Sequence, residues 1–298
     1  MNKLPFSLCL LLMVARLPCY AATSPLPQIT EGTLSNGLKY TLVPLQGQQQ
    51  RIDIRLLVKA GSLNEANDQL GVAHMLEHMV FHRSAKFPKG IAPTLQQQGW
   101  VRGKNYNAVT NFERTMYMLS PPKGSQQTEQ GLNVLSQMVG YPAFAQQDLE
   151  LERPIILEEW RGKLGVAERM NQQRIQALRA NSRYPERPTI GTEASIRNTN
   201  VATIRQFHDV WYQPQNMQIM LIGDVDPQKV VPQIEQYFGS IPAKKLPLPE
   251  NYDPQLSKQL RIVQLYDSES GSSQISYVYR LDDNASKKVG KEGMRQRL

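Results

Sequence analysis

Cysteine is scarce in this 298-residue chain, whose two cysteines, Cys9 and Cys19, both lie near the N-terminus. If residues 1–21 are removed as a signal peptide, the remaining chain has no cysteine at all. A disulfide framework, a thiol nucleophile and a zinc site with cysteine ligands are then all excluded. A chain without cysteine also folds without oxidative side reactions outside the cytoplasm.

Long hydrophobic runs are absent apart from residues 4–14, and the mean hydropathy is −0.45. This excludes a protein with several membrane spans, because each span needs about 20 apolar residues. The run follows Lys3, and residues 19–21 have the small-x-small pattern of a cleavage site. We therefore expect residues 1–21 to be a secretory signal peptide, with no stable membrane span after cleavage. An uncleaved anchor is the alternative.

Charge of one sign is not concentrated anywhere along the chain. The formal net charge is +8, and without Lys3 and Arg16 there are 32 basic against 26 acidic residues, or +6. The longest lysine pairs are 244–245 and 287–288, and no nucleic-acid-binding motif accompanies them. The excess positive charge therefore indicates a solvated surface, and no nucleic-acid partner is expected.

Strand and helix patterns interleave along residues 29–243. The Asn36-Gly37 pair is typical of a tight hairpin turn, and the apolar alternation over 52–58 predicts a strand. Further strands are predicted at 115–119 and 217–222, and helices at 69–81, 95–98, 126–139, 145–163 and 168–180. Because the order is not a strict βαβ repeat, we expect an α+β domain of layered sheet and helices.

This domain is expected to cover residues 22–243. The proline-rich residues 244–258 are typical of a linker. Two more strands are predicted at 259–266 and 273–280. They would begin a second α+β domain, which residues 259–298 are too few to complete.

Three of the four histidines lie within nine residues of one another. The stretch His74-Met75-Leu76-Glu77-His78 matches H-x-x-E-H, the inverted zincin motif. On a helix, both imidazoles share one face and can bind one metal ion. Glu77 can then approach a metal-activated water as a general base without binding the metal, which is the arrangement for hydrolysis. The alternative is two helix histidines with an incidental glutamate.

A third zinc ligand should be a carboxylate, since cysteine is absent. The predicted helix 145–163 has four candidates, which are Glu150, Glu152, Glu158 and Glu159. Glu152 and Glu159 lie two turns apart on one face, whereas Glu158 points about 100° away, toward solvent. Spacing alone leaves open which of Glu152 and Glu159 binds the metal and which supports a histidine.

These motifs resemble the pitrilysin/insulinase family of zinc peptidases, the inverzincins, and within it the periplasmic, PqqL-like bacterial members. The matching stretches are Ala60-Gly-Ser-Leu-Asn-Glu65, Gly71 to Phe81, Asn107-Ala-Val-Thr110, Glu152 to Glu159, Tyr212 to Met217 and Gly223-Asp224. The resemblance implies a domain of the pitrilysin/mitochondrial processing peptidase type. It also implies a periplasmic zinc metallo-endopeptidase that acts on peptides or unfolded proteins.

The same resemblance assigns roles to particular residues. It makes Glu159 the third ligand of one Zn²⁺ per chain, beside His74 and His78, and Glu152 a supporting carboxylate. Asn107 and Ala108 would lie on an edge strand that holds the substrate backbone. Family members need no histidine at position 82, so His82 is expected to be a surface or supporting residue.

Family peptidases enclose their substrate between two halves, and the second half adds an arginine and a tyrosine near the scissile bond. A C-terminal half or a partner subunit is therefore expected to complete the chamber. Two alternatives stay open: a non-catalytic subunit that binds peptides or a partner, and an inactive truncated fragment. Zinc content and turnover would distinguish them.

Overall fold

The computed structural model describes residues 27–124, 126–256 and 259–280. The predicted signal peptide, residues 1–21, lies outside these ranges, as do residues 281–298 of the predicted second domain. Among the residues described, no helix combines the length and the apolar character needed to cross a membrane.

A six-stranded mixed sheet forms the centre of the fold. Its strands lie in the order β1-β2-β6-β3-β5-β4. Their bounds are β1 (Thr30–Thr33), β2 (Lys39–Pro44), β3 (Ile52–Val58), β4 (Tyr106–Thr110), β5 (Thr115–Leu119) and β6 (Met217–Gly223). Only the β2–β6 pair is parallel among these strands. Strand β4 therefore closes one edge of the sheet.

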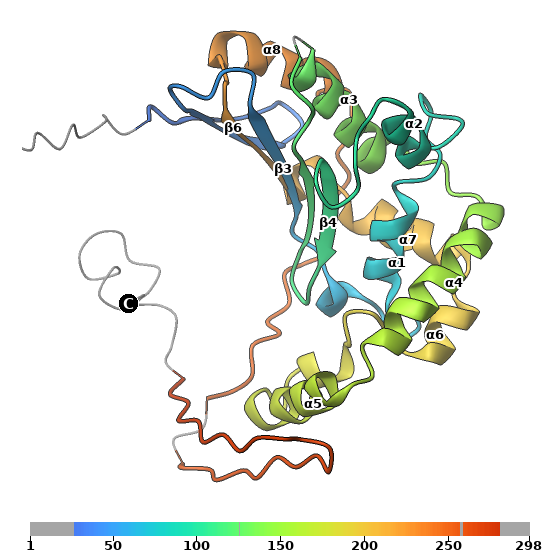
Figure 1. The fold of residues 1–298 in the computed structure, drawn as a ribbon, viewed down its shortest axis with the longest axis vertical. Helices are drawn as coiled ribbons and strands as arrows, with labels where there is room; N and C mark the ends of the chain where they lie inside the picture. Colours follow the sequence, from blue (N-terminus) through green and yellow to red (C-terminus); the bar gives the residue numbers. More distant parts are fainter. Residues whose placement is uncertain (1–26, 125, 257–258, 281–298) are drawn as a thin grey trace, which may run out of the picture.

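Eight α-helices accompany this sheet in the part of the chain that the structure describes. They are α1 (Val72–Met79), α2 (Ile91–Gln97), α3 (Gln127–Gly140), α4 (Gln146–Gly162), α5 (Val166–Leu178), α6 (Glu193–Asn198), α7 (Val201–Trp211) and α8 (Pro227–Phe238). Figure 1 shows α1, α3 and α7 on one side of the sheet. Every second residue of β3 is fully buried, because only one face meets the core. The predicted layered α+β class is confirmed.

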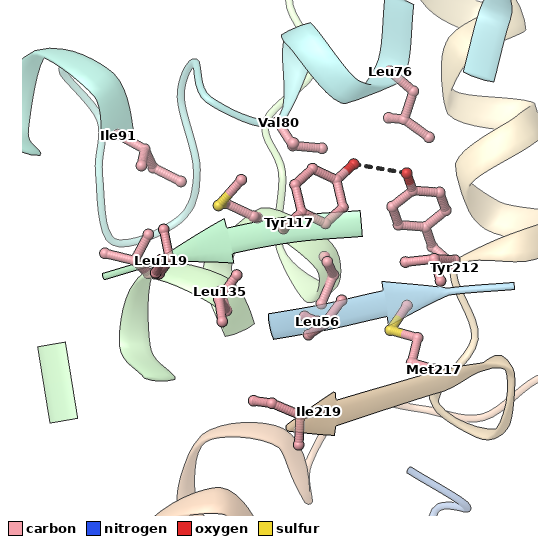
Figure 2. Close-up of a cluster of buried hydrophobic side chains, with 14 of the residues drawn as sticks. Leu56, Leu76, Val80, Ile91, Tyr117, Leu119, Leu135, Tyr212, Met217 and Ile219 are labelled. Carbon is pink, nitrogen blue, oxygen red and sulfur yellow. Dashed lines mark hydrogen bonds between the residues drawn. The ribbon is translucent and has the colours of Figure 1, made fainter. Parts of the chain in front are cut away.

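One face of helix α1 packs against this core. Leu76 and Val80 approach Tyr117 of β5 in Figure 2, where the Tyr117 hydroxyl is bonded to that of Tyr212 at 2.7 Å. All eight residues of α1 are buried. The helix is thus fixed between the sheet and α4, and its polar side chains meet groups supplied by those neighbours.

The start of α1 is held by a buried carboxylate. Glu65 accepts the backbone N–H of Gly71 at 3.0 Å and that of Ala73 at 2.9 Å, two donors that the helix itself leaves free. Gly71 has a φ of +80°, and a Cβ there would lie 2.7 Å from the carbonyl oxygen of Ile190. Glycine is therefore required where the chain enters this helix.

The strands predicted at 259–266 and 273–280 are wrong, because the described residues of both segments form no regular secondary structure. A strand needs a neighbour for its backbone groups, and none is paired with these segments. Leu260 and Ile262, which the pattern placed in a strand, are more than 90% exposed. The segment instead lies beside α5, where Asp267 pairs with Arg169 at 2.7 Å (Figure 1).

Candidate metal centre

His74 and His78 of α1 meet Glu159 of α4. The Nε2 atom of each imidazole lies 3.5 Å from Oε2 of Glu159. The two rings have centroids 4.7 Å apart, because residues four apart share one helix face. The three ligand atoms all lie within 4.8 Å of one another. Two residues of α1 and one of α4 thus point their donor atoms at one spot.

The spacing of these donors fits a zinc ion. Ligand atoms 2.0–2.2 Å from a tetrahedral zinc are about 3.3–3.6 Å from one another. The two N···O distances of 3.5 Å fall in this range. Two imidazoles and one carboxylate are also a donor set of catalytic zinc sites, in which a fourth position stays open.

Glu152 lies behind His78, on the side away from Glu159. One oxygen is 2.7 Å from Nδ1 of His78, and the other is 2.8 Å from Nε2 of His82. Burial would raise the pKa of Glu152, but the two imidazoles lower it to about 2. Burial likewise lowers the pKa of His78, yet hydrogen bonds to Glu152 and Glu159 raise it to about 9. The two carboxylates thus face opposite nitrogens of His78, and Glu159 faces His74 as well.

Glu159 is the more exposed of these two carboxylates. Its hydrogen bonds to His74 and His78 lower its pKa far below the ordinary value, although burial acts in the opposite direction. Its Oε1 atom pairs with Lys163 at 2.6 Å, which leaves Oε2 for the imidazoles. Glu158, the neighbour expected to face solvent, pairs instead with Arg161 on the outer face of α4.

His82 belongs to a polar cluster that sequence reasoning did not assemble. His82 also lies 3.9 Å from Asp148. The Asp148 carboxylate accepts hydrogen bonds from two nitrogens of Arg83. The signal was present in the four-residue spacing of His78 and His82 and in the same spacing of Asp148 and Glu152. It was incomplete because nothing in the spacing shows that these two helices face each other.

Glu77 lies next to the triad of His74, His78 and Glu159 without belonging to it. Oε2 of Glu77 accepts a hydrogen bond of 2.5 Å from the Thr110 hydroxyl on β4. The carboxylate lines the same pocket as His74 and His78. Thr110 was part of a matching stretch, but its contact with Glu77 was not anticipated from the sequence.

A pocket of about 150 Å³ opens over the triad. Its lining residues are His74, Glu77, His78, Phe81, Arg102, Asn107, Ala108 and Glu159. Asn107 and Ala108 therefore lie beside the histidines on β4, which is an edge strand. Sequence reasoning missed Phe81 and Arg102.

One backbone N–H of this edge strand is already bonded to a side chain of the same strand. The N–H of Ala108 donates to Oδ1 of Asn107 at 2.9 Å. Strand β4 pairs with β5 through residues 106–110, and no other described strand pairs with it. The turn at Arg102 and Gly103 bonds to Tyr106, and beyond that residue the outer edge is open to an added strand once the Asn107 amide turns away.

Two family models match the chain. One, described as "Insulinase (Peptidase family M16)", matches residues 42–187, and the other, "Peptidase M16 inactive domain", matches residues 198–288. The chain belongs to the insulinase family. Strand β6, from the second matched range, lies between β2 and β3 of the first, so the two ranges share one sheet.

Several insulinase-family relatives are similar over most of the chain. The "Probable zinc protease PqqL" of Haemophilus influenzae is 35% identical over 212 residues, which are 70% of this chain and 23% of that protein. The protein of the same name from Escherichia coli is 31% identical over 92% of this chain and 30% of its own length. The chain thus spans less than a third of these two curated relatives.

Solved structures agree with this assignment. A structure described as the ferredoxin protease FusC in complex with Arabidopsis ferredoxin is 53% identical, with a TM-score of 0.85, over 92% of this chain and 30% of its own. The first half of the periplasmic protease PqqL from Escherichia coli is 30% identical, with a TM-score of 0.73, over 77% of this chain and 49% of its own. The predicted family membership is confirmed.

Proposed function

We propose that this chain is the zinc-binding part of a metallo-endopeptidase that hydrolyses peptide bonds. The observation that carries the proposal is the triangle of His74, His78 and Glu159, whose donor separations suit one zinc ion. Membership of a peptidase family whose relatives are named zinc proteases supports the same reading. One zinc per chain is the expected stoichiometry.

When bound, zinc acts as a Lewis acid that lowers the pKa of a water molecule and polarises the scissile carbonyl. Glu77 is the general base: its carboxylate takes the proton of the attacking water and returns it to the leaving amine. The hydrogen bond from Thr110 to Oε2 holds that carboxylate toward the pocket. Glu152 orients His78 by accepting a hydrogen bond from its Nδ1–H, which leaves Nε2 free to bind the metal.

Substrate positioning falls to β4. An extended peptide adds to its open edge, and the main chain near Asn107 and Ala108 holds the peptide backbone beside the triad. This mode needs no particular sequence, because the bonds are made by backbone groups. It requires Asn107 to release the N–H of Ala108 as the substrate arrives.

We place this activity in the periplasm, after removal of residues 1–21. The likeness to the periplasmic protease PqqL supports the compartment. The likeness to FusC, solved with ferredoxin, supports a protein substrate for this chain as well. A C-terminal half or a partner subunit completes the chamber around that substrate, since the relatives are much longer than this chain.

The test separates metal ligands from the base. Elemental analysis of the purified chain should give nearly one zinc per molecule, and His74→Ala or His78→Ala should lose most of it. Glu159→Gln should weaken zinc binding, whereas Glu77→Gln should keep zinc and abolish peptide cleavage. Glu158→Gln is the matched control, because this neighbour of Glu159 points away from the pocket.

Full zinc retention in both histidine variants would overturn the metal site. Loss of zinc in Glu77→Gln equal to that in Glu159→Gln would show that the roles of base and ligand are wrong. A chain that binds zinc and peptides but never cleaves them, even with a relative's C-terminal half, would be the non-catalytic subunit instead.

A further inference from the structure

Arg102 lines the pocket over the triad, although no motif pointed to it. It lies between α2 and β4 and is exposed. Among the residues that the structure describes, no acidic group lies within ion-pair distance of it, whereas Arg83, Arg153 and Arg161 each pair with a carboxylate. The pocket therefore contains a guanidinium whose charge the described chain does not neutralise.

The backbone around Arg102 is held in place. Asn105 accepts the N–H of Val101 at 3.0 Å and donates its amide to the carbonyl of Ser120 at 2.8 Å. The N–H of Gly103 donates to the carbonyl of Tyr106 at 2.9 Å. The backbone of Arg102 forms an isolated parallel β-bridge with that of Tyr106 at the start of β4. This turn fixes the base of the arginine side chain beside the edge strand.

The other charged groups of the pocket already have tasks under the proposed function, on which this inference rests. His74, His78 and Glu159 face one another as metal donors, and Glu77 is held by Thr110. Arg102 is the remaining charge of the lining. A peptide paired with β4 runs past it, and alternate side chains of that peptide point toward the pocket.

We propose that Arg102 is a specificity-determining residue, which binds a substrate carboxylate close to the scissile bond. A guanidinium presents two parallel N–H donors that match a carboxylate, and an ion pair in a partly enclosed pocket is stronger than one in open solvent. The enzyme thereby favours peptides with an acidic side chain, or a free C-terminus, within a few residues of the cleaved bond. Uncharged peptides bind through their backbone alone.

The experiment compares cleavage of matched fluorogenic peptides by the zinc-loaded full chain. In one series Glu replaces Gln at each position within four residues of the scissile bond, and in another the C-terminus is free or amidated. The enzymes are the unchanged chain, Arg102→Met, Arg102→Glu and the control Lys104→Met, which removes a charge from the same loop but outside the pocket lining. Peptide binding to the zinc-loaded Glu77→Gln variant provides a second readout without turnover.

We expect kcat/KM at one position to be about tenfold or more higher for Glu than for Gln, as for other hydrogen bonds between charged groups. Arg102→Met should abolish this preference, Arg102→Glu should reverse it, and Lys104→Met should retain it. Added salt should reduce the preference. A preference that follows the free C-terminus and not the side chain would identify the chain end as the source of the carboxylate.

Two failures are distinguishable. If peptides are cleaved or bound with no preference for a carboxylate, or if Arg102→Met keeps the preference, this inference is wrong and the proposed function stands. If the zinc-loaded chain neither binds nor cleaves any peptide of the set, the proposed function itself falls, and the role of Arg102 with it.

Discussion

His82 lies 2.8 Å from the Glu152 carboxylate, whose other oxygen is 2.7 Å from His78. Glu152 is thus shared between a proposed zinc ligand and a histidine one helical turn further on. A carboxylate bonded at both oxygens cannot rotate freely, so His82 fixes the group that fixes His78. In the proposed zinc site, His82 therefore acts through Glu152 and is not a ligand.

The first prediction follows from that chain of contacts. His82→Ala should weaken zinc binding about 10-fold and Glu152→Ala up to about 100-fold, because partners of a metal ligand contribute in this range. His78→Ala should lose far more. Competition with a chelator measures the three affinities, and the melting temperature of each metal-free variant controls for unfolding. An affinity unchanged by His82→Ala would contradict the supporting role.

The second prediction concerns pH. In the metal-free chain the pKa of His78 is raised to about 9, so below that pH its ring is protonated at both nitrogens. Zinc must displace the proton on Nε2, and binding therefore releases protons and tightens as pH rises toward 9. Apparent dissociation constants at pH 6.5, 7.5 and 8.5 should fall steadily. Equal constants across this series would show that His78 is neutral before the metal arrives.

The third prediction concerns the start of α1. Burial raises the pKa of Glu65 to about 8, although its bonds from Ala73 and Gly71 oppose the shift. The carboxyl is then neutral at pH 6, and Glu65→Gln should cost little there. Glu65→Leu leaves two buried N–H donors without a partner and should cost about 2–5 kcal/mol of unfolding free energy.

The same shift sets a pH dependence of stability. The folded pKa lies above the unfolded one, so the contribution is complete below pH 4.5 and is lost as pH rises through 8. Urea unfolding of the metal-free chain should show the unchanged chain losing stability relative to Glu65→Gln between pH 5 and 8. A gain in stability relative to Glu65→Gln over that range would mean that the ionised carboxylate is the native form.

The fourth prediction concerns the domain boundary. The buried core reaches Ile241, and residues 244–251 are almost all exposed. Limited proteolysis should therefore cut between Lys244 and Tyr252 or later and leave a stable core that binds zinc. Mass spectrometry of the products locates the cuts. A first cut before Ala243 would mean that the boundary is misplaced.

A fifth prediction concerns turnover. The isolated chain should cleave peptides about 100- to 1000-fold more slowly than a relative with both halves, because a missing oxyanion donor costs this much. The comparison uses one peptide and equal zinc loading. Equal rates would show that the described domain suffices as an enzyme.

Local sequence patterns predicted several of the helices and strands nearest the site, and the failures of these patterns have physical causes. Alternation over 52–58 predicted β3, and the spacing of His74 and His78 predicted α1. Both predictions depend only on which side chains of a single segment share one face. The periodicity alone did not predict β4, and the edge strand at Asn107 and Ala108 was expected only from the family resemblance. The strands expected at 259–266 and 273–280 failed in the opposite way: their pattern suits a strand, but no neighbour is there to pair with them.

The sequence by itself determined the H-x-x-E-H pair of histidines, the adjacent Glu77 and the two glutamates on one helix face, because these relations lie within single helices. Only the tertiary structure decided that Glu159 faces Nε2 of His78 and Glu152 faces Nδ1, since this depends on how α4 crosses α1. The contacts of Thr110 and Arg102 were decided in the same way. Thr110 is on a strand and Arg102 is in a loop, and the sheet brings both to the site. The periodicity of a segment does not predict its distance from a helix elsewhere in the chain.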